Sequence, residues 1–240
     1  MIVSVSNEKI KYIRSLKEKK FRDRENLYIV EGVKLVNEAI KKAEVVTIVS
    51  TSNCITEEYS AYEVIEVTEK VYKSISDEIN PQGILAVVKK PTFKLPKEIT
   101  TGIVLDKLRD PGNLGTVIRT AVASGYKDLF LIDSVDPFNP KTVRASMGGI
   151  FGVNLHFVDY EYFKDIKTPI IIADMNGRNV FNYTSPKSFL LAIGNEANGI
   201  SDNLKGLATE TVSIPMQGNI ESLNAGVSAG ILMYLLKNNK

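Results

Sequence analysis

Polar residues gather in three short stretches of this 240-residue sequence, each placed directly after an apolar run. The stretches are LRDPGNLG at 108–115, GNEANG at 194–199 and PMQGNIESLN at 215–224. Glycine lets the backbone approach a ligand closely, and amide and hydroxyl groups can orient a polar ligand. We therefore expect one site, assembled from these stretches and from the helix that follows the first of them. Its candidate residues are Asn113, Arg119, Glu196, Ser222 and Asn224.

Each candidate residue also has a purely structural interpretation. Asn113 and Ser222 have side chains that commonly cap helices, and each stands near the start of an expected helix. Arg119 would lie on a helix, where an arginine often rests its aliphatic stem on the protein surface. The placement of all the candidates near strand ends favours a shared site over these separate roles.

Other catalytic arrangements find little support in the sequence. There is no GxGxxG or GxxxxGK[ST] pattern, which argues against an ordinary dinucleotide fold and against a P-loop. The one histidine, His156, lies in the apolar stretch NLHFV and is interpreted as a structural or edge-strand residue. A serine–histidine–aspartate triad would need His156, and no GxSxG elbow accompanies it. We interpret the one cysteine, Cys54, as a packing residue, and we expect no metal site.

Composition is ordinary for a folded protein of one large or two small domains, with 44% hydrophobic and 24% charged residues. The net charge of +2 gives no global basic field, so nucleic-acid binding would have to use local patches. A single cysteine excludes an intramolecular disulfide. No apolar run approaches the roughly 20 residues of a membrane span, and the N-terminus lacks a secretory signal. We therefore expect a cytoplasmic protein.

The first part of the chain predicts a small α/β domain over residues 1–92. Residues 6–20 are expected to form a helix with Ile10 and Ile13 on one face and basic residues on the other. That basic face is either a solvated surface or an RNA contact. Strands and helices then alternate until a linker with two prolines at 91–100. The basic residues considered for RNA phosphate contacts are Lys17, Lys19, Lys20, Arg22 and Arg24.

The rest of the chain, residues 100–240, predicts a parallel sheet covered on both faces. Continuous apolar strands are expected at 102–108, 128–133, 155–159, 169–175, 189–194 and 210–216, with helices between most of them. Ligands of such sheets bind at the carboxyl ends of the strands. Each polar stretch follows one of these strands, so the stretches would converge on one pocket if the three strands are neighbours.

The sequence resembles the SpoU-type RNA ribose 2′-O-methyltransferases, which belong to the knotted SPOUT class. Three motifs carry the resemblance: DPGNLGTVIRTAVASG, LAIGNEANGI and IPMQGNIESLNAGVSAGILMY. Their order, spacing and strand-end placement agree with that family over residues 102–237. The part before the linker is similar to the family's substrate-binding domain. The implied fold is a small α/β RNA-binding domain, residues 1–92, followed by a parallel-sheet domain with a deep trefoil knot, residues 100–240.

The resemblance implies methylation of a ribose 2′-hydroxyl in RNA, with 23S rRNA as the expected substrate and S-adenosylmethionine as the cofactor. Arg119 would fix or activate the hydroxyl, and Glu196 would orient Arg119 or a neighbouring amide. The other implied catalytic residues, which would hold the substrate and the loops, are Asn113, Ser222 and Asn224. The implied cofactor-binding residues are Gly194, Asn195, Gly199, Ile214, Pro215, Met216 and Leu223.

A homodimer is also implied, because the active site of that family uses residues from two subunits. Three alternatives stay open: a tRNA ribose methyltransferase, a non-catalytic RNA-binding or ribosome-assembly protein, and a small-molecule methyltransferase. The complete set of polar candidates speaks against lost activity. A small-molecule enzyme would leave the first domain without a purpose.

Overall fold

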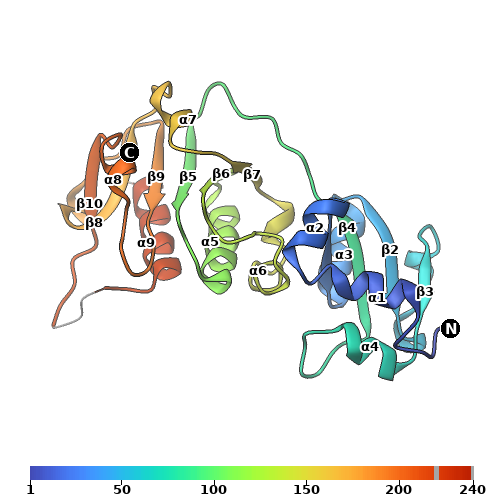
Figure 1. The fold of residues 1–240 in the computed structure, drawn as a ribbon. Coiled ribbons are helices and arrows are strands. Elements are labelled where there is room, and N and C mark those ends of the chain that lie inside the picture. The colour runs from blue at the N-terminus through green and yellow to red at the C-terminus, as the bar shows by residue number, and fades with distance from the viewer. Residues whose placement is uncertain (219–221, 239–240) are drawn as a thin grey trace. The chain divides into compact units, whose positions relative to one another are not determined.

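The computed structural model describes residues 1–218 and 222–238, and Figure 1 shows its fold. None of the described helices is long and apolar enough to cross a membrane. The chain forms two compact units. The first consists of Met1–Thr92 with Asp136–Phe151, and the second of Phe93–Val135 with Gly152–Lys240.

A segment from the second half of the chain thus belongs to the first unit. The sequence predicts continuous domains over 1–92 and 100–240, whereas Asp136–Phe151 packs with the first 92 residues. The assignment of RNA binding to one range and methyl transfer to the other stays a prediction. The linker after residue 90 has no regular secondary structure, as expected.

The first unit is built on a four-stranded mixed sheet. Its strands are β1 (Leu27–Glu31), β2 (Val45–Ser50), β3 (Val64–Glu66) and β4 (Ile84–Lys89). Their order is β1–β4–β2–β3; β4 runs antiparallel to both neighbours, and β2 pairs in parallel with β3. Its helices are α1 (Glu8–Ser15), α2 (Lys19–Glu25), α3 (Val33–Lys42), α4 (Glu69–Ile75) and α6 (Pro140–Ala145), with short 3₁₀ turns η1 (Ser52–Cys54), η2 (Glu57–Tyr59) and η3 (Gly149–Phe151).

The helix predicted over 6–20 is two helices, α1 and α2, with a break at 16–18. Asn7 caps α1 by accepting a hydrogen bond from the Lys9 amide (3.0 Å). At the break, the Arg22 guanidinium donates to the carbonyl oxygens of Leu16 (2.9 Å) and Lys17 (2.5 Å). The carbonyl groups freed at the end of α1 therefore find a partner on α2, which lets the chain turn there.

Arg22 was grouped with the RNA-contacting residues, and that prediction is wrong. Its side chain is buried, and both Nε and Nη2 donate to Oδ2 of Asp136 (3.0 and 2.6 Å). Asp136 also accepts a hydrogen bond from the Phe138 amide (3.0 Å). This buried pair attaches the segment Asp136–Phe151 to the first unit, where Phe138 packs against Tyr28 with ring centroids 4.9 Å apart.

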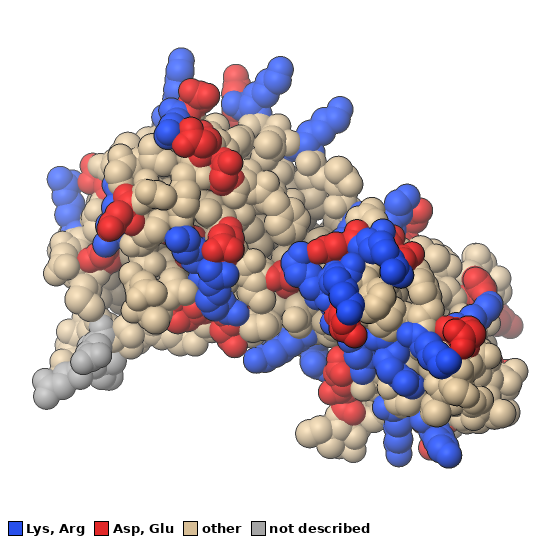
Figure 2. Space-filling view, viewed as in Figure 1, with Lys and Arg blue, Asp and Glu red and all other residues tan. Residues whose placement is uncertain are grey.

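The four other residues considered for RNA phosphate contacts each form an ion pair with a nearby carboxylate. They are Lys17, Lys19, Lys20 and Arg24. Figure 2 shows the resulting mixture of blue and red atoms over α1 and α2. Lys19, Lys20 and Arg24 remain more than half exposed in these pairs. Exposed pairs contribute little to stability, so these three side chains stay available to phosphate groups.

The second unit is built on a six-stranded sheet in which all strands are parallel, as predicted. Its strands are β5 (Thr101–Asp106), β6 (Asp128–Ile132), β7 (Asn154–Phe157), β8 (Ile170–Asn179), β9 (Phe189–Ile193) and β10 (Glu210–Ser213). The strand order is β10–β8–β9–β5–β6–β7. Its helices are α5 (Pro111–Ser124), α7 (Glu161–Lys164), α8 (Asp202–Lys205) and α9 (Ala225–Asn238), with the 3₁₀ turn η4 (Val180–Asn182).

Helices pack on this sheet and on each other. Phe163 of α7 and Leu204 of α8 share a buried cluster with Phe130 of β6. The helices α5 and α9 lie side by side. A Cβ atom on Gly226 would lie only 3.1 Å from Thr116, so glycine allows these two helices to approach closely. Strand order and pairing do not define how loops thread through one another, so the deep trefoil knot stays a prediction.

The structural interpretation of His156 is confirmed. It lies on β7 at the edge of the sheet and is 3% exposed. Its Nε2 is 2.9 Å from Oδ1 of Asp128, and its ring stacks on Phe130 with centroids 5.0 Å apart. A buried ring on an edge strand, away from the polar stretches, cannot serve them as a base.

The buried ion pair between Arg22 and Asp136 gives a stability prediction. Replacing Arg22→Ala leaves Asp136 buried without its partner and should lower the free energy of unfolding by about 3–5 kcal/mol. The double change Arg22→Met and Asp136→Leu should recover most of that loss, because no uncompensated charge remains. Urea unfolding of the full chain, followed by circular dichroism, measures both.

The exposed pair of Lys19 with Asp23 provides the control for that experiment. Lys19→Ala removes a cation from the same helix and should change the free energy of unfolding by less than about 1 kcal/mol. Equal losses in Arg22→Ala and Lys19→Ala would contradict the structural role given to the buried pair.

Candidate active site

The first two polar stretches lie side by side, because β5 and β9 are parallel neighbours with Leu105 paired to Ile193. The expectation that all three preceding strands are neighbours is only partly correct. Strand β10 lies beyond β8, which separates it from β9. The third stretch nevertheless reaches the first, since Asn224 donates from Nδ2 to Oδ1 of Asn113 (2.8 Å).

The second stretch forms a tight loop closed on itself. The amide and carbonyl groups of Asn195 and Gly199 bond to each other in both directions, at 2.9 Å each. Asn195 also donates from Nδ2 to the carbonyl oxygen of Lys107 (2.8 Å), a residue with a positive φ of 57°. A Cβ atom on Gly194 would lie 2.3 Å from the carbonyl carbon of Gly199, so only glycine fits there. The sequence therefore builds a rigid loop fastened to the end of β5.

Three side chains join the three stretches in one chain of hydrogen bonds. Asn224 donates to Oδ1 of Asn113, and Asn113 donates from Nδ2 to Oε1 of Glu196 (2.9 Å). An ionised carboxylate only accepts, so Asn113 must turn its NH₂ group to Glu196 and its oxygen to Asn224. Oδ1 of Asn224 in turn accepts from the amides of Gly226 and Val227 (2.9 and 3.2 Å). Every member thus has a fixed orientation.

Glu196 is held as an anion by this arrangement. Its carboxylate also accepts from the backbone amides of Arg109 (3.3 Å) and Asp110 (3.2 Å). Burial alone would raise the pKa of Glu196, but the hydrogen bonds from Asn113 and from backbone amides outweigh it, so the pKa lies below the usual value. Of the two partners expected for Glu196, the neighbouring amide is the one that it contacts.

The helix-capping interpretation of Asn113 and Ser222 is wrong. Asp110 caps α5, because its Oδ1 accepts from the Asn113 amide (2.8 Å), and Asn224 caps α9. The side chain of Asn113 is therefore free for the hydrogen-bond chain, although it is nearly buried. Ser222 lies on the wall of a pocket.

That pocket has a volume of about 460 Å³ and lies beside the hydrogen-bond chain, where Glu196 borders it. Eight of the predicted site residues line it, six of them predicted for cofactor binding. The remaining four predicted site residues are not among those that line the pocket: Asn113, Arg119, Pro215 and Asn224. The lining residues from the prediction are Gly194, Asn195, Glu196, Gly199, Ile214, Met216, Ser222 and Leu223.

Sequence reasoning missed two parts of this pocket. The bulged part of β8 at 173–176 lines it, because pairing of β8 with β10 jumps from Ile172 to Arg178 and leaves those residues without a partner on β10. The pattern ADMNG, in which a glycine follows a polar residue inside an otherwise apolar strand, is a signal that could have indicated a bulge there. The first turns of α9 also line the pocket through Ala225 and Ser228.

Arg119 does not line the pocket. It is exposed on α5, six residues after Asn113, and no hydrogen bond or ion pair joins its guanidinium to any described residue. A guanidinium stays protonated in proteins and carries five donors in a planar fork. Arg119 is therefore available to a ligand that arrives from solvent.

The pocket fits a nucleoside with a positive centre. Its volume falls in the usual range for small-molecule sites, which is roughly 300–1,000 Å³. Ile193, Ile214 and Leu223 give it apolar walls, and the carboxylates of Asp174 and Glu196 suit a cation. Among residues 1–218 and 222–238, no group of three or more metal-binding side chains is present.

Comparison with known proteins identifies the family. The model of the SpoU rRNA Methylase family matches residues 100–234, which is more than half of the chain. The model of the MRM3-like substrate binding domain matches residues 7–86. The chain belongs to the SpoU rRNA methylase family.

Individual proteins of this family align over nearly the whole chain. The 23S rRNA (guanosine(2553)-2′-O)-methyltransferase RlmP of Bacillus subtilis is 33% identical, with 98% of each chain covered. The structure of an AdoMet-bound rRNA methyltransferase from Sinorhizobium meliloti superposes with a TM-score of 0.90 at 31% identity, covering 98% of this chain and 96% of that one. The AdoMet complex of the SpoU methyltransferase AviRb from Streptomyces viridochromogenes gives 0.84 at 28% identity, covering 96% and 97%.

The lowered pKa of Glu196 gives a prediction for the pH dependence of the site. Its folded-state pKa lies below the usual value, so the contribution of the carboxylate is complete above that value and is lost as the pH falls through the folded pKa. The NMR signals of the Asn113 side-chain amide should therefore shift with a midpoint below the ordinary pKa of glutamate. In Glu196→Gln this titration should be absent. A midpoint at or above the ordinary value would show that the hydrogen bonds do not hold the anion.

Proposed function

We propose that this protein methylates a ribose 2′-hydroxyl in RNA, with S-adenosylmethionine as the methyl donor and large-subunit rRNA as the substrate. One observation carries the proposal: three stretches far apart in the sequence are joined by hydrogen bonds next to a nucleoside-sized pocket. Membership of the SpoU family and the 2′-O-methyltransferase names of the aligned relatives support the reaction. The complete hydrogen-bond chain favours an active enzyme over a non-catalytic RNA-binding protein.

The cofactor would be held by the tight loop at 194–199 and by the third polar stretch. Gly194 keeps the loop closed on Gly199 and lines the pocket, and Ile214 and Leu223 provide apolar contact to the adenosyl group. When bound, S-adenosylmethionine supplies a methyl group that the positive sulfonium has already activated. Asn195, Gly199, Pro215 and Met216 complete the proposed set, with Pro215 acting through the backbone rather than through the pocket wall.

The catalytic task of the protein is mainly to align the reacting atoms. Alignment can contribute up to ~7–11 kcal/mol, whereas a positioned base contributes about 10²–10⁴-fold in rate. A site without histidine is compatible with this balance. Arg119 remains protonated, so it fixes the target ribose or its phosphate with paired donors instead of removing a proton.

Two of the other catalytic candidates hold the starts of helices α5 and α9 in place, and the third lies on the pocket wall. Asn113 sets the geometry at the start of α5, the helix that carries Arg119, through its bond to Glu196. Asn224 fixes the start of α9 and joins it to the same group. Ser222, on the pocket wall, offers a hydroxyl to the substrate or to the cofactor.

The proposed partners of the protein are rRNA and a second copy of the chain. The match of residues 7–86 to a substrate binding domain favours rRNA over tRNA and over a small-molecule substrate. A homodimer is supported by apolar side chains left exposed on the packed helices α5 and α9, namely Val122, Val227 and Tyr234. The enzyme would work without metal, in the cytoplasm where ribosomes are assembled.

The proposed reaction can be tested by the product. The purified protein should transfer labelled methyl from S-adenosylmethionine to unmodified large-subunit rRNA, and nuclease digestion should place the label in one 2′-O-methylnucleoside. Transfer to tRNA alone would favour the tRNA alternative. Label on a base, or no transfer to any RNA with cofactor bound, would contradict the proposal.

Arg119 gives the sharpest prediction for a single residue. Arg119→Ala should reduce single-turnover methylation at saturating RNA by at least ~10²-fold, the low end for one lost catalytic contact. Cofactor affinity measured by calorimetry should change little, because Arg119 lies outside the pocket wall. Arg119→Lys should rescue poorly, since an ammonium keeps the charge but loses the planar fork.

A matched control is Arg178→Ala, which removes another mostly exposed arginine from the same unit, with a side chain 73% exposed. It should leave turnover and cofactor affinity near those of the unaltered protein. Near-normal turnover in Arg119→Ala would return Arg119 to the status of a surface arginine.

A further inference from the structure

A second cavity, of about 250 Å³, lies within the first unit, where three segments meet. They are the turn from β1 into α3, the loop between α4 and β4, and the residues at and after the end of α6. We propose that this cavity binds one unpaired nucleotide of the substrate RNA. The inference rests on the proposed function in taking RNA as the substrate. The residues that carry it are Lys34, Glu78, Asn80, Gln82, Arg144 and Met147.

Two amide side chains on the cavity wall can read the edge of a base. Gln82 accepts a hydrogen bond at Oε1 from the Val33 amide (2.8 Å), which fixes its orientation and leaves its NH₂ group as a donor. Asn80 is exposed, and its side chain makes no hydrogen bond to any residue that the structure describes. Amide groups bond well to the edges of bases that are not paired.

Two cations beside the amides suit the phosphate of such a nucleotide. Lys34 is exposed and has no ion-pair partner among the described residues. Arg144 forms an ion pair with Glu78 at 2.8 Å, in which the two side chains are 38% and 37% exposed. An ion pair this exposed contributes little, so Arg144 can exchange Glu78 for a phosphate group at small cost.

Met147 supplies an apolar surface at the rim. It is 46% exposed and has a positive φ of 50°, which is uncommon for a residue with a long side chain. Gly148 follows with φ of 89°, so two successive residues have a positive φ and the chain turns tightly at this point. A backbone conformation this unfavourable is kept where the surroundings or a function require it. Here it places an unbranched, adaptable side chain next to the two amides.

The size and chemistry of the cavity favour a nucleotide over a protein partner. Its volume lies below the usual range for drug-sized ligands, and it suits one base with part of its sugar. Protein interfaces are larger and centre on aromatic and apolar side chains, whereas this small wall combines two amides and two cations with the carboxylates of Glu31 and Glu78 and the apolar side chains of Leu35 and Met147. Residues 7–86 also match a substrate binding domain, to which the α6 segment adds Arg144 and Met147.

The test uses the full chain and unmodified large-subunit rRNA, with affinity measured by filter binding at several salt concentrations. Asn80→Ala and Arg144→Gln should each weaken binding about tenfold, the effect expected for one lost base or phosphate contact. Lys34→Gln should also reduce the salt dependence by roughly one counterion, whereas Asn80→Ala should leave it unchanged. Rates of methylation at low RNA concentration should fall in parallel, and rates at saturating RNA should not.

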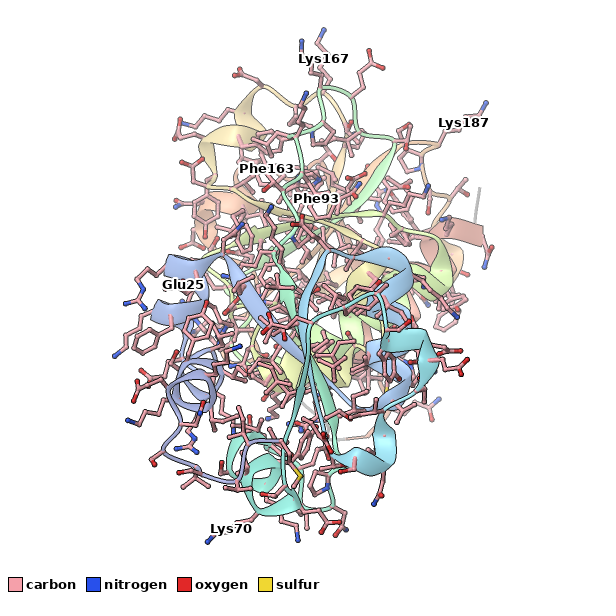
Figure 3. All side chains as sticks on the ribbon, turned by 90° about the vertical axis from the view of Figure 1, so that its right-hand side faces the viewer. Glu25, Lys70, Phe93, Phe163, Lys167 and Lys187 are labelled. Carbon is pink, nitrogen blue, oxygen red and sulfur yellow. The ribbon has the colours of Figure 1, made fainter. Side chains whose placement is uncertain are left out.

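Two matched controls lie in the same unit, at residues that do not line the cavity. Lys70→Gln changes the charge as Lys34→Gln does, and Figure 3 shows Lys70 extending from α4 into solvent. Asn53→Ala matches Asn80→Ala at another exposed asparagine. Both controls should bind RNA within about twofold of the unaltered protein.

Affinities of Asn80→Ala, Arg144→Gln and Lys34→Gln that equal those of the controls would overturn the proposal. All three changes are at the surface, and unchanged circular dichroism and cofactor affinity identify variants that are folded. Failure of the proposed function is a separate outcome, since the unaltered protein would then bind RNA without forming any 2′-O-methylnucleoside.

Discussion

The hydrogen bonds that run from Asn224 through Asn113 to Glu196 are the constraint on which the site depends. They connect the starts of helices α5 and α9 with the loop that follows strand β9. The bonded residues are 83 and 111 positions apart in the sequence. The carboxylate at one end accepts only, which orients both amides. Removal of any member would leave a partly buried polar group without its partner, a loss larger than that of one exposed hydrogen bond.

Two backbone features make this arrangement possible. The close approach of Gly194 to Gly199 keeps the second stretch compact enough for Glu196 to meet the amides at the start of α5. The bulge of β8, where its pairing with β10 jumps from Ile172 to Arg178, brings residues 173–176 to the wall of the pocket. An irregular part of the sheet thus forms one wall of the pocket, together with residues of the second and third polar stretches.

Much of this could be predicted from the sequence, because strands and turns depend on local patterns. The parallel sheet and most of the pocket residues follow from apolar runs that end in glycine and amide residues. Two outcomes depend on tertiary contacts that local patterns do not contain, and a third depends on a choice between neighbouring helix caps. Arg22 appears as one more basic residue in KKFRDR, yet it is buried on Asp136, 114 residues later. Asp110 and Asn224 cap helices where Asn113 and Ser222 were equally plausible, and β8 separates two strands expected to be neighbours.

A double-mutant cycle between Glu196 and Asn224 tests the central claim most directly, because these two residues interact only through Asn113. Cofactor affinity and the stability of the second unit would be measured for Glu196→Ala, Asn224→Ala and the pair. If the hydrogen-bond chain acts as one unit, the effects should be non-additive by about 0.5–3 kcal/mol, since the second change removes a link that is already broken. Additivity within a few tenths of a kcal/mol would contradict the account and reduce the three stretches to independent loops.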